Sequence, residues 1–232
     1  MPSKRYVKNA KLVEDRKVFP LKEAIQVLLK FEKAKFNETV EIAFRLGVDP
    51  KQSDQMVRGT VPLPHGSGKN VRVLVFAKPG PTADAARAAG AEFVGFDDMI
   101  KKCTDGWVDF DVAVATPEAM VEVRKLGKVL GPRGLMPNPK TGTVTDDTAK
   151  AVKEVKAGRV EFKVDKAGNI HVPVGKITFK PEAIEENARV VIEAIAKARP
   201  ASVKGVFLQS CTISATMSPG VRVDTREFVA SV

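Results

Sequence analysis

The sequence of 232 residues is poor in the side chains that build most metal and catalytic sites, with only 2 histidines and 2 cysteines. Cys103 and Cys211 stand far apart, with neither a CxxC motif nor a neighbouring histidine, which argues against a zinc site. We expect both to be buried, reduced thiols. No apolar run approaches the roughly 20 residues of a membrane span, and residues 1–17 are basic and polar, unlike a secretory signal. The expectation is a cytoplasmic protein with no metal and no membrane partner.

Phosphate-binding motifs are missing as well. Gly66-Ser-Gly-Lys69 lacks both the first glycine and the final Ser or Thr of a Walker loop. The strand predicted at 71–77 ends in Lys78-Pro-Gly-Pro81 instead of the GxGxxG of dinucleotide sites. A Ser/His/Asp triad through His65 or His171 stays open, but no GxSxG elbow accompanies it. We therefore expect no enzyme activity, no cofactor and no small-molecule substrate.

Positive charge is what the sequence has in excess, with Lys+Arg 38 against Asp+Glu 28 and a net charge of +10. Such an excess favours a polyanionic partner such as nucleic acid, although solubility alone is the alternative. The excess is uneven: residues 1–69 carry +6, residues 70–158 carry +1 and residues 159–232 carry +3. If the two outer segments fold together, they form one basic domain beside a nearly neutral one.

The middle of the chain alternates strand and helix patterns. Three apolar runs are typical of buried strands, at 71–77, 92–95 and 110–115. Helical patterns follow them at 82–89, 97–103 and 117–126. Thr82 or Asp84 would cap the first helix and Thr116 the last. This order predicts a small parallel sheet covered by helices on both faces.

The outer segments have strand and helix patterns of a different kind. Amphipathic helices are predicted at 20–31 and 181–199. Strand patterns occur at 39–46, 57–63, 159–164, 169–174 and 206–212. We interpret the second strand as the partner of the first, and residues 165–168 as the turn of a hairpin.

We therefore predict a mixed fold of two domains. A discontinuous α+β domain is built from both chain ends, residues 1–66 plus 159–232. An inserted three-layer α/β (Rossmann-like) domain occupies residues 67–158. Glycines at both crossings are typical of hinges between domains.

Three segments carry candidate binding chemistry. The Gly- and Pro-rich stretch 125–143 holds Lys128, Arg133 and Lys140 without an intervening acid, which indicates either contact with nucleic acid or the other domain, or a structural Ω-loop. Phe36 among lysines is typical of RNA recognition, but also of a core phenylalanine at a helix–strand corner. The hydroxyl-rich segment 210–219 would let a sugar-phosphate surface approach closely; an ordinary edge strand and turn is the alternative.

These residues also carry a resemblance that runs in order over essentially the whole chain. The matching motifs are Ala34-Lys-Phe-Asn-Glu-Thr-Val-Glu41, Ser53-Asp-Gln55, Val57-Arg-Gly-Thr60, Leu63-Pro-His-Gly66, Gly106-Trp107, Leu130-Gly-Pro-Arg-Gly-Leu-Met-Pro-Asn-Pro-Lys140, Lys156-Ala-Gly158 and Thr216-Met217. They resemble the ribosomal protein L-one family of bacteria, and the Gly-Pro-Arg-Gly-Leu-Met-Pro-Asn-Pro block is the most specific of them.

The resemblance implies a split first domain and an inserted α/β second domain. It implies a non-enzymatic, ribosome-associated protein of the mobile large-subunit stalk, which binds large-subunit rRNA beside the exit site as a monomer within the subunit. It also implies help in moving and releasing deacylated exit-site tRNA, and repression of the chain's own operon messenger (mRNA).

The family's rRNA contacts carry over residue by residue. They fall on Lys35, Phe36, Thr39, Lys163, Asp165, Lys166, Ser210, Thr216 and Met217. At Ser218 the chain departs from the family's Thr-Met-Gly-Pro pattern. The Cβ of Ser218 stands where a glycine would let the backbone approach RNA most closely. Lys128, Arg133 and Lys140 remain a possible interdomain or RNA loop.

Two rival functions make different demands on the sequence. A nucleotide-using enzyme built on the middle domain would need the phosphate motifs that are absent. A DNA-binding regulator would need a helix-turn-helix or basic zipper pattern, and neither is found.

Overall fold

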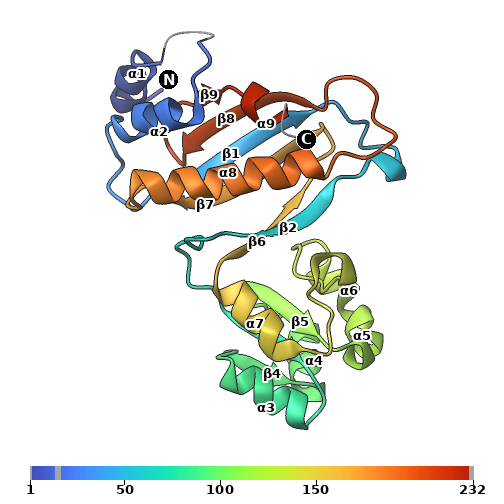
Figure 1. Ribbon diagram of the computed structural model, residues 1–232. Helices are drawn as coiled ribbons and strands as arrows, with labels where there is room; N and C mark the ends of the chain where they lie inside the picture. The colour runs from blue at the N-terminus through green and yellow to red at the C-terminus, as the bar shows by residue number, and fades with distance from the viewer. Residues whose placement is uncertain (1, 14–16, 230–232) are drawn as a thin grey trace. The chain divides into compact units, whose positions relative to one another are not determined.

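The computed structural model describes residues 2–13 and 17–229. The chain forms two compact units, one of Met1–Gly68 with Arg159–Val232 and the other of Lys69–Gly158. We call them the split unit and the inserted unit; in Figure 1 the split unit is blue to cyan and orange to red, and the inserted unit green to yellow. In the part of the chain that the structure describes, no helix combines the length and apolar character that crossing a membrane requires.

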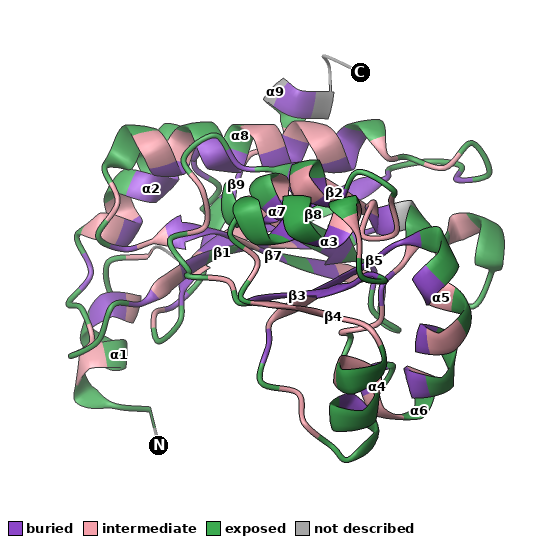
Figure 2. Ribbon diagram, turned by 90° about the horizontal axis from the view of Figure 1, so that it is seen from below, coloured by how far each residue is buried: buried purple, intermediate pink, exposed green. Residues whose placement is uncertain are grey.

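The split unit is built on a four-stranded antiparallel sheet in the order β7-β1-β8-β9. Its strands are β1 (Thr39–Leu46), β7 (Asn169–Lys176), β8 (Leu208–Ala215) and β9 (Val221–Val223). Helices α2 (Leu21–Leu29) and α8 (Pro181–Lys197) pack on one face, and their buried residues join those of the strands in one core. Figure 2 shows this buried side of α8 in purple.

Smaller elements complete the split unit. They are α1 (Lys4–Ala10), α9 (Arg226–Val229), the 3-10 turn η1 (Ser53–Gln55), and the two-stranded sheet of β2 (Arg58–Pro62) and β6 (Arg159–Lys163).

Two expected strand pairings in this unit are wrong. β2 pairs with β6 rather than with β1, and β6 and β7 belong to different sheets rather than to one hairpin. The turn between β6 and β7 does form, because Asp165 N–H donates to the Asn169 carbonyl at 2.8 Å. Beyond this turn β6 pairs with β2 and β7 pairs with β1. Alternation of apolar residues predicts a strand but does not specify its neighbour.

The inserted unit has three layers around the parallel sheet β4-β3-β5. Its strands are β3 (Val73–Phe76), β4 (Phe93–Gly95) and β5 (Val112–Ala115). Helices α3 (Pro81–Ala88) and α7 (Thr148–Lys156) share one core with alternate strand residues. The opposite core lies under α4 (Asp97–Thr104), α5 (Pro117–Val123), η2 (Arg124–Leu126) and α6 (Gly127–Leu130). A last 3-10 turn, η3, is Pro139–Thr141. The predicted mixed α/β fold is confirmed.

Local details test two further predictions. Thr116 caps α5 as expected, since its Oγ1 accepts a hydrogen bond from Ala119 N–H at 3.3 Å. Helix α3 begins earlier than predicted: Gly80 is its N-cap and Pro81 its first residue, so neither Thr82 nor Asp84 caps it. Cys103 and Cys211 are buried and unbonded, as predicted. Burial raises the pKa of the Cys211 thiol to about 12, so it stays protonated.

A candidate nucleic-acid interface

The second face of the split unit's main sheet is polar. Because strand side chains alternate between faces, the residues between the core positions share this side, which we call the open face. It comprises Thr39, Glu41, Ala43 and Arg45 of β1, Asn169, His171 and Pro173 of β7, and Ser210, Thr212 and Ser214 of β8. Each of them is exposed or half-buried. In Figure 1, α2 and α8 lie together over the other face.

At one end of the open face, two large apolar side chains stand in solvent. Phe36, in the loop between α2 and β1, is 53% exposed, and Met217, in the turn after β8, is 52% exposed. Phe36 is thus not the core phenylalanine that was the alternative interpretation. Single exposed apolar side chains are common on protein surfaces, but two large ones exposed together at one place are typical of a surface that binds a partner.

A buried carboxylate joins the loops that carry Phe36 and Met217. Glu38 is 3% exposed. Its side chain accepts hydrogen bonds from Ala34 N–H at 2.6 Å and from Met217 N–H at 3.1 Å. Its main-chain carbonyl accepts from Ile177 N–H at 2.9 Å. Since buried carboxylates need such partners, Glu38 fixes three segments from distant parts of the sequence.

Two threonines are tied together beside Glu38. Thr216 Oγ1 accepts a hydrogen bond from Thr39 N–H at 3.0 Å, and Lys176 Nζ donates to Thr39 Oγ1 at 2.8 Å. Ser218 closes the same turn, because its Oγ accepts from Ala215 N–H at 2.9 Å. These hydroxyls therefore shape the end of the face.

The turn between β6 and β7 lies near the opposite end of the open face, because Asn169 pairs with Arg45. Asp165 Oδ1 accepts hydrogen bonds from Ala167 N–H at 2.8 Å and Asn169 N–H at 2.7 Å. The Asn169 hydrogen bond is the largest cause that lowers the pKa of Asp165. Asp165 thus builds the turn, and its carboxylate is occupied by this local role.

Cations flank both ends of the open face. Lys163 and Lys166 are exposed on either side of Asp165, and Lys35 is exposed beside Phe36. Ser210 pairs with Arg45 at the same end as Asp165. An eight-residue strand separates the two ends by about 24 Å. The sheet therefore carries the predicted residues around Phe36 at one end and those around Asp165 at the other, on a surface long enough for several nucleotides.

The predicted loop of the inserted unit belongs to the other compact unit. Lys128 is exposed on α6, and Arg133 is exposed in the turn that follows it; the side chain of Lys140 lies outside the described residues. The loop is ordered by its own hydrogen bonds, among them Asn138 N–H to Thr143 Oγ1 at 2.8 Å. It therefore has the internal packing of an Ω-loop while presenting two cations to solvent.

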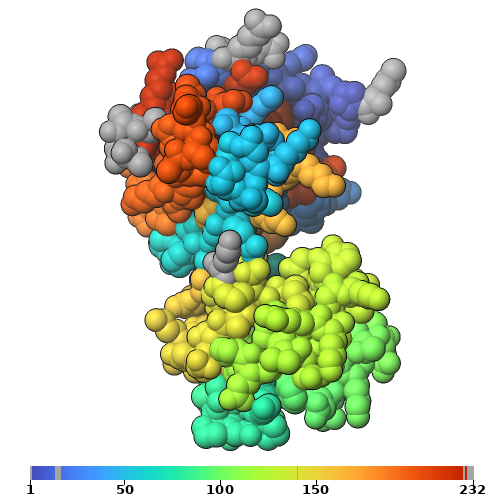
Figure 3. Space-filling model, turned by 90° about the vertical axis from the view of Figure 1, so that its right-hand side faces the viewer, coloured from blue at the N-terminus to red at the C-terminus, as the bar shows by residue number. Residues whose placement is uncertain are grey.

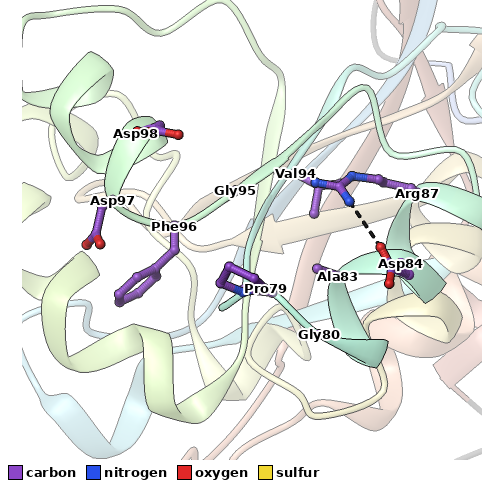
Figure 4. A pocket seen from close by; sticks show the side chains of 11 residues that line it. Pro79, Gly80, Ala83, Asp84, Arg87, Val94, Gly95, Phe96, Asp97 and Asp98 are labelled. Atoms are coloured by element: carbon purple, nitrogen blue, oxygen red, sulfur yellow. Dashed lines mark hydrogen bonds and ion pairs between the residues drawn. The ribbon is translucent and has the colours of Figure 1, made fainter.

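A cavity of about 420 Å³ lies at the carboxyl ends of β3 and β4, where doubly wound folds bind nucleotides. Figure 4 shows carboxylates around it, from Asp84, Asp97 and Asp98. Arg87, the cation among the described lining residues, is paired with Asp84 at 3.0 Å. This charge repels phosphate, so the cavity gives no support to a nucleotide-using enzyme. Within residues 2–13 and 17–229 there is also no cluster of His, Cys, Asp and Glu suited to a metal ion.

Several residues of the interface were missed in the sequence. The sequence around Glu38 is typical of a surface residue before a strand. Its burial depends on the turn that carries Met217, 179 positions away. Lys176 has no local sequence signal that marks it as part of the site either. Arg45 and His171 could have been found from the strand alternation alone, which places them on the solvent side of β1 and β7.

Comparison with known protein families assigns the chain to a family. The model of the Ribosomal protein L1p/L10e family matches residues 28–219, most of the chain. The match includes the loop of Phe36, the whole inserted unit and the turn of Met217. Members are structural, RNA-binding proteins of the large ribosomal subunit rather than a family of enzymes. The chain belongs to the Ribosomal protein L1p/L10e family.

Proposed function

We propose that the split unit is the rRNA-binding part of this ribosomal protein and that its open face is the binding surface. The observation that carries the proposal is the pair of exposed side chains, Phe36 and Met217, held on loops that share the buried carboxylate of Glu38. A rigid apolar end beside small polar side chains suits the sugar and base surfaces of folded RNA. Binding energy is then not spent on ordering these loops.

The cations have a separate role in the proposal. Lys35, Lys163 and Lys166 are exposed near the two ends of the face, where they would neutralise phosphates and release counterions. Thr39, Asp165, Ser210, Thr216 and Ser218 would supply shape, since the hydrogen bonds of most of them are made within the protein.

In the ribosome, this surface would hold the protein, as a monomer, on rRNA of the mobile stalk. From there the protein would assist the movement and release of deacylated tRNA at the exit site. If the chain's own operon mRNA folds into a structure similar to the rRNA site, the open face would also bind this messenger and repress its translation. The inserted unit, with Lys128, Arg133 and Lys140, would contribute less to rRNA affinity. It would instead move relative to the split unit or contact tRNA.

The direct test is the affinity of the full chain for a stalk rRNA fragment, measured by filter binding. The double variant Phe36→Ala/Met217→Ala should weaken binding at least 30-fold, because a stacked aromatic contributes roughly 1–3 kcal/mol and burial of a methionine side chain contributes a similar amount. Val121→Ala is the matched control, because Val121 is 65% exposed on the inserted unit. Equal affinity of the double variant and the control would refute the proposal.

A further inference from the structure

Helix α1 is held on the split unit by polar contacts, and its buried side chain, Asn9, makes the central ones. Asn9 is 1% exposed and is the buried residue of this helix. Its Nδ2 donates to the Glu32 carbonyl at 3.1 Å, and its Oδ1 accepts from Glu32 N–H at 2.9 Å. Lys8 Nζ adds an ion pair with the Glu32 carboxylate at 3.1 Å. Paired hydrogen bonds of this kind fix both the position and the rotation of the helix.

Val13 packs against the core, whereas three other apolar side chains of this region stand in solvent. Tyr6 is 40% exposed, Val7 44% and Leu12 52%. A helix that serves the core presents an apolar stripe to it, whereas α1 leaves an aromatic ring and aliphatic groups in water. Figure 3 shows the N-terminal residues, in dark blue, at the surface of the split unit.

Positive charge runs from α1 to the loop of Phe36. We call this set the basic strip: Lys4, Arg5, Lys8, Lys11, Lys30, Lys33 and Lys35. In residues 4–13 and 30–37 the single acid is Glu32, and Lys8 neutralises it. Among the described residues, no carboxylate forms an ion pair with Lys4, Arg5 or Lys11. Lys4, Arg5 and Lys11 therefore keep their charge for an external partner.

We propose that α1 is a second RNA-contact surface, which binds the phosphate backbone of the rRNA beyond the part that lies on the open face. Glu32, the anchor of α1, lies four residues before Phe36, so a single RNA that contacts Phe36 continues over the basic strip. Tyr6 offers a ring on which a nucleotide packs, and the cations release counterions. This inference rests on the proposed function of the open face and adds a separate, sequence-independent contribution to its affinity.

The first test uses the salt dependence of rRNA binding by the full chain. Lys4→Gln/Arg5→Gln/Lys11→Gln removes three cations and retains Lys8, which holds Glu32. The slope of log K against log salt should become shallower by about 2 to 3, and affinity at about 0.1 M salt should fall roughly 10- to 100-fold. The matched control, Lys22→Gln/Lys180→Gln/Lys197→Gln, removes the same charge from α2, from α8 and from the N-cap of α8. It should change the slope by less than about 0.5.

The second test locates the RNA. Because Cys103 and Cys211 are buried, a hydroxyl-radical probe tethered to Val7→Cys labels one accessible position. It should cut the bound rRNA at discrete sites, whereas a probe at Lys197→Cys on α8 should not. A charge variant indistinguishable from its control, together with no cutting from position 7, would overturn the proposal.

The two proposals fail in different ways. If Phe36→Ala/Met217→Ala loses affinity while the α1 variant matches its control, the open face binds RNA and α1 does not. If neither variant loses affinity, the open face itself is not the binding surface. An α1 variant that keeps full rRNA affinity but leaves the ribosome more readily would assign the helix to a protein partner and refute an RNA contact.

Discussion

The two units of this protein use similar helices and strands but cover their sheets differently. In the inserted unit, helices pack on both faces of β4-β3-β5, and alternate residues of each strand enter two separate cores. In the split unit, α2 and α8 cover one face of the main sheet, and its other face carries polar side chains. A sheet with one covered face keeps a broad, rigid surface for a large ligand. A sheet with two covered faces leaves only the ends of its strands and the adjoining loops accessible to a ligand.

Charge follows the same division. The inserted unit carries acids around the cavity at the carboxyl ends of its strands. The split unit has exposed lysines at both ends of its open face and along α1. The comparison therefore predicts that rRNA affinity depends on the integrity of one unit and is nearly independent of the other.

The largest effects should come from removing one core phenylalanine in each unit. Phe44 of the split unit and Phe76 of the inserted unit are 1% and 0% exposed. Either change to alanine should destabilise its own unit by about 3–5 kcal/mol, because it leaves a cavity. Thermal unfolding followed by circular dichroism measures this loss.

The two variants should differ in binding. Near the temperature at which its split unit melts, Phe44→Ala should lose rRNA affinity. At the same temperature Phe76→Ala should stay within about 2-fold of the unaltered chain. Equal losses would show that the units fold or bind as one, which contradicts the comparison.

A smaller effect is expected from the carboxylate that joins the two loops. Glu38→Ala leaves the N–H groups of Ala34 and Met217 without their acceptor, which should cost about 2–4 kcal/mol of split-unit stability. It should also weaken rRNA binding more than 10-fold at a temperature where the unit is folded. Glu38→Gln, which keeps one acceptor oxygen, should recover part of both losses. A Glu38→Ala chain with full affinity would show that Glu38 does not position the loops.

Acid should act on the inserted unit through Asp111. Its pKa is lowered to about 2, first because Lys69 donates a hydrogen bond at 2.6 Å and then through Arg72. Aspartates of the unfolded chain titrate near 3.9, so the unfolded state takes up the proton first as pH falls. The stabilisation is complete above about pH 4 and is lost as pH falls toward about 2.

Asp111→Asn tests this linkage. The variant should lose about 1–2 kcal/mol of stability at pH 7, after allowance for the exposure of Lys69. Its stability should then vary less between pH 4 and pH 2 than that of the unaltered chain. Denaturant unfolding at several pH values measures both quantities, and parallel pH profiles would contradict the assignment.

The smallest effect is expected at Ser218, where the chain departs from the family pattern. Its hydroxyl is turned to the backbone of Ala215 and Pro219 inside the turn. Ser218→Gly should therefore change rRNA affinity less than about 3-fold, because one internal hydrogen bond is exchanged for a freer backbone. A gain above 10-fold in filter binding would mean that the Cβ itself obstructs the RNA.

Local signals predicted much of the fold. The alternation in 39–46 predicts a strand with one solvent face, and β1 has it. Thr116 followed by proline predicts the start of α5. The partner of a strand has no local signal of this kind. β2 was expected beside β1, yet its neighbour is β6, about a hundred residues later.

The site shows the same limit. An aromatic among lysines pointed to Phe36, because composition near a loop is local information. Glu38 gave no signal, since its burial arises from Met217 and Ile177, both more than a hundred residues away. Residues that organise a surface from the inside are therefore the ones that sequence patterns miss.

The central claim is tested most directly by removing the inserted unit. Pro62 pairs with Arg159 across β2 and β6, so a short linker can join residues 1–68 to 159–232 without stretching the split unit. Once circular dichroism shows that this chain is folded, its affinity for the stalk rRNA fragment is measured beside that of the full chain. We predict affinities within about 3-fold of each other. A loss of 100-fold or more would contradict the account and place the main rRNA contact on the inserted unit.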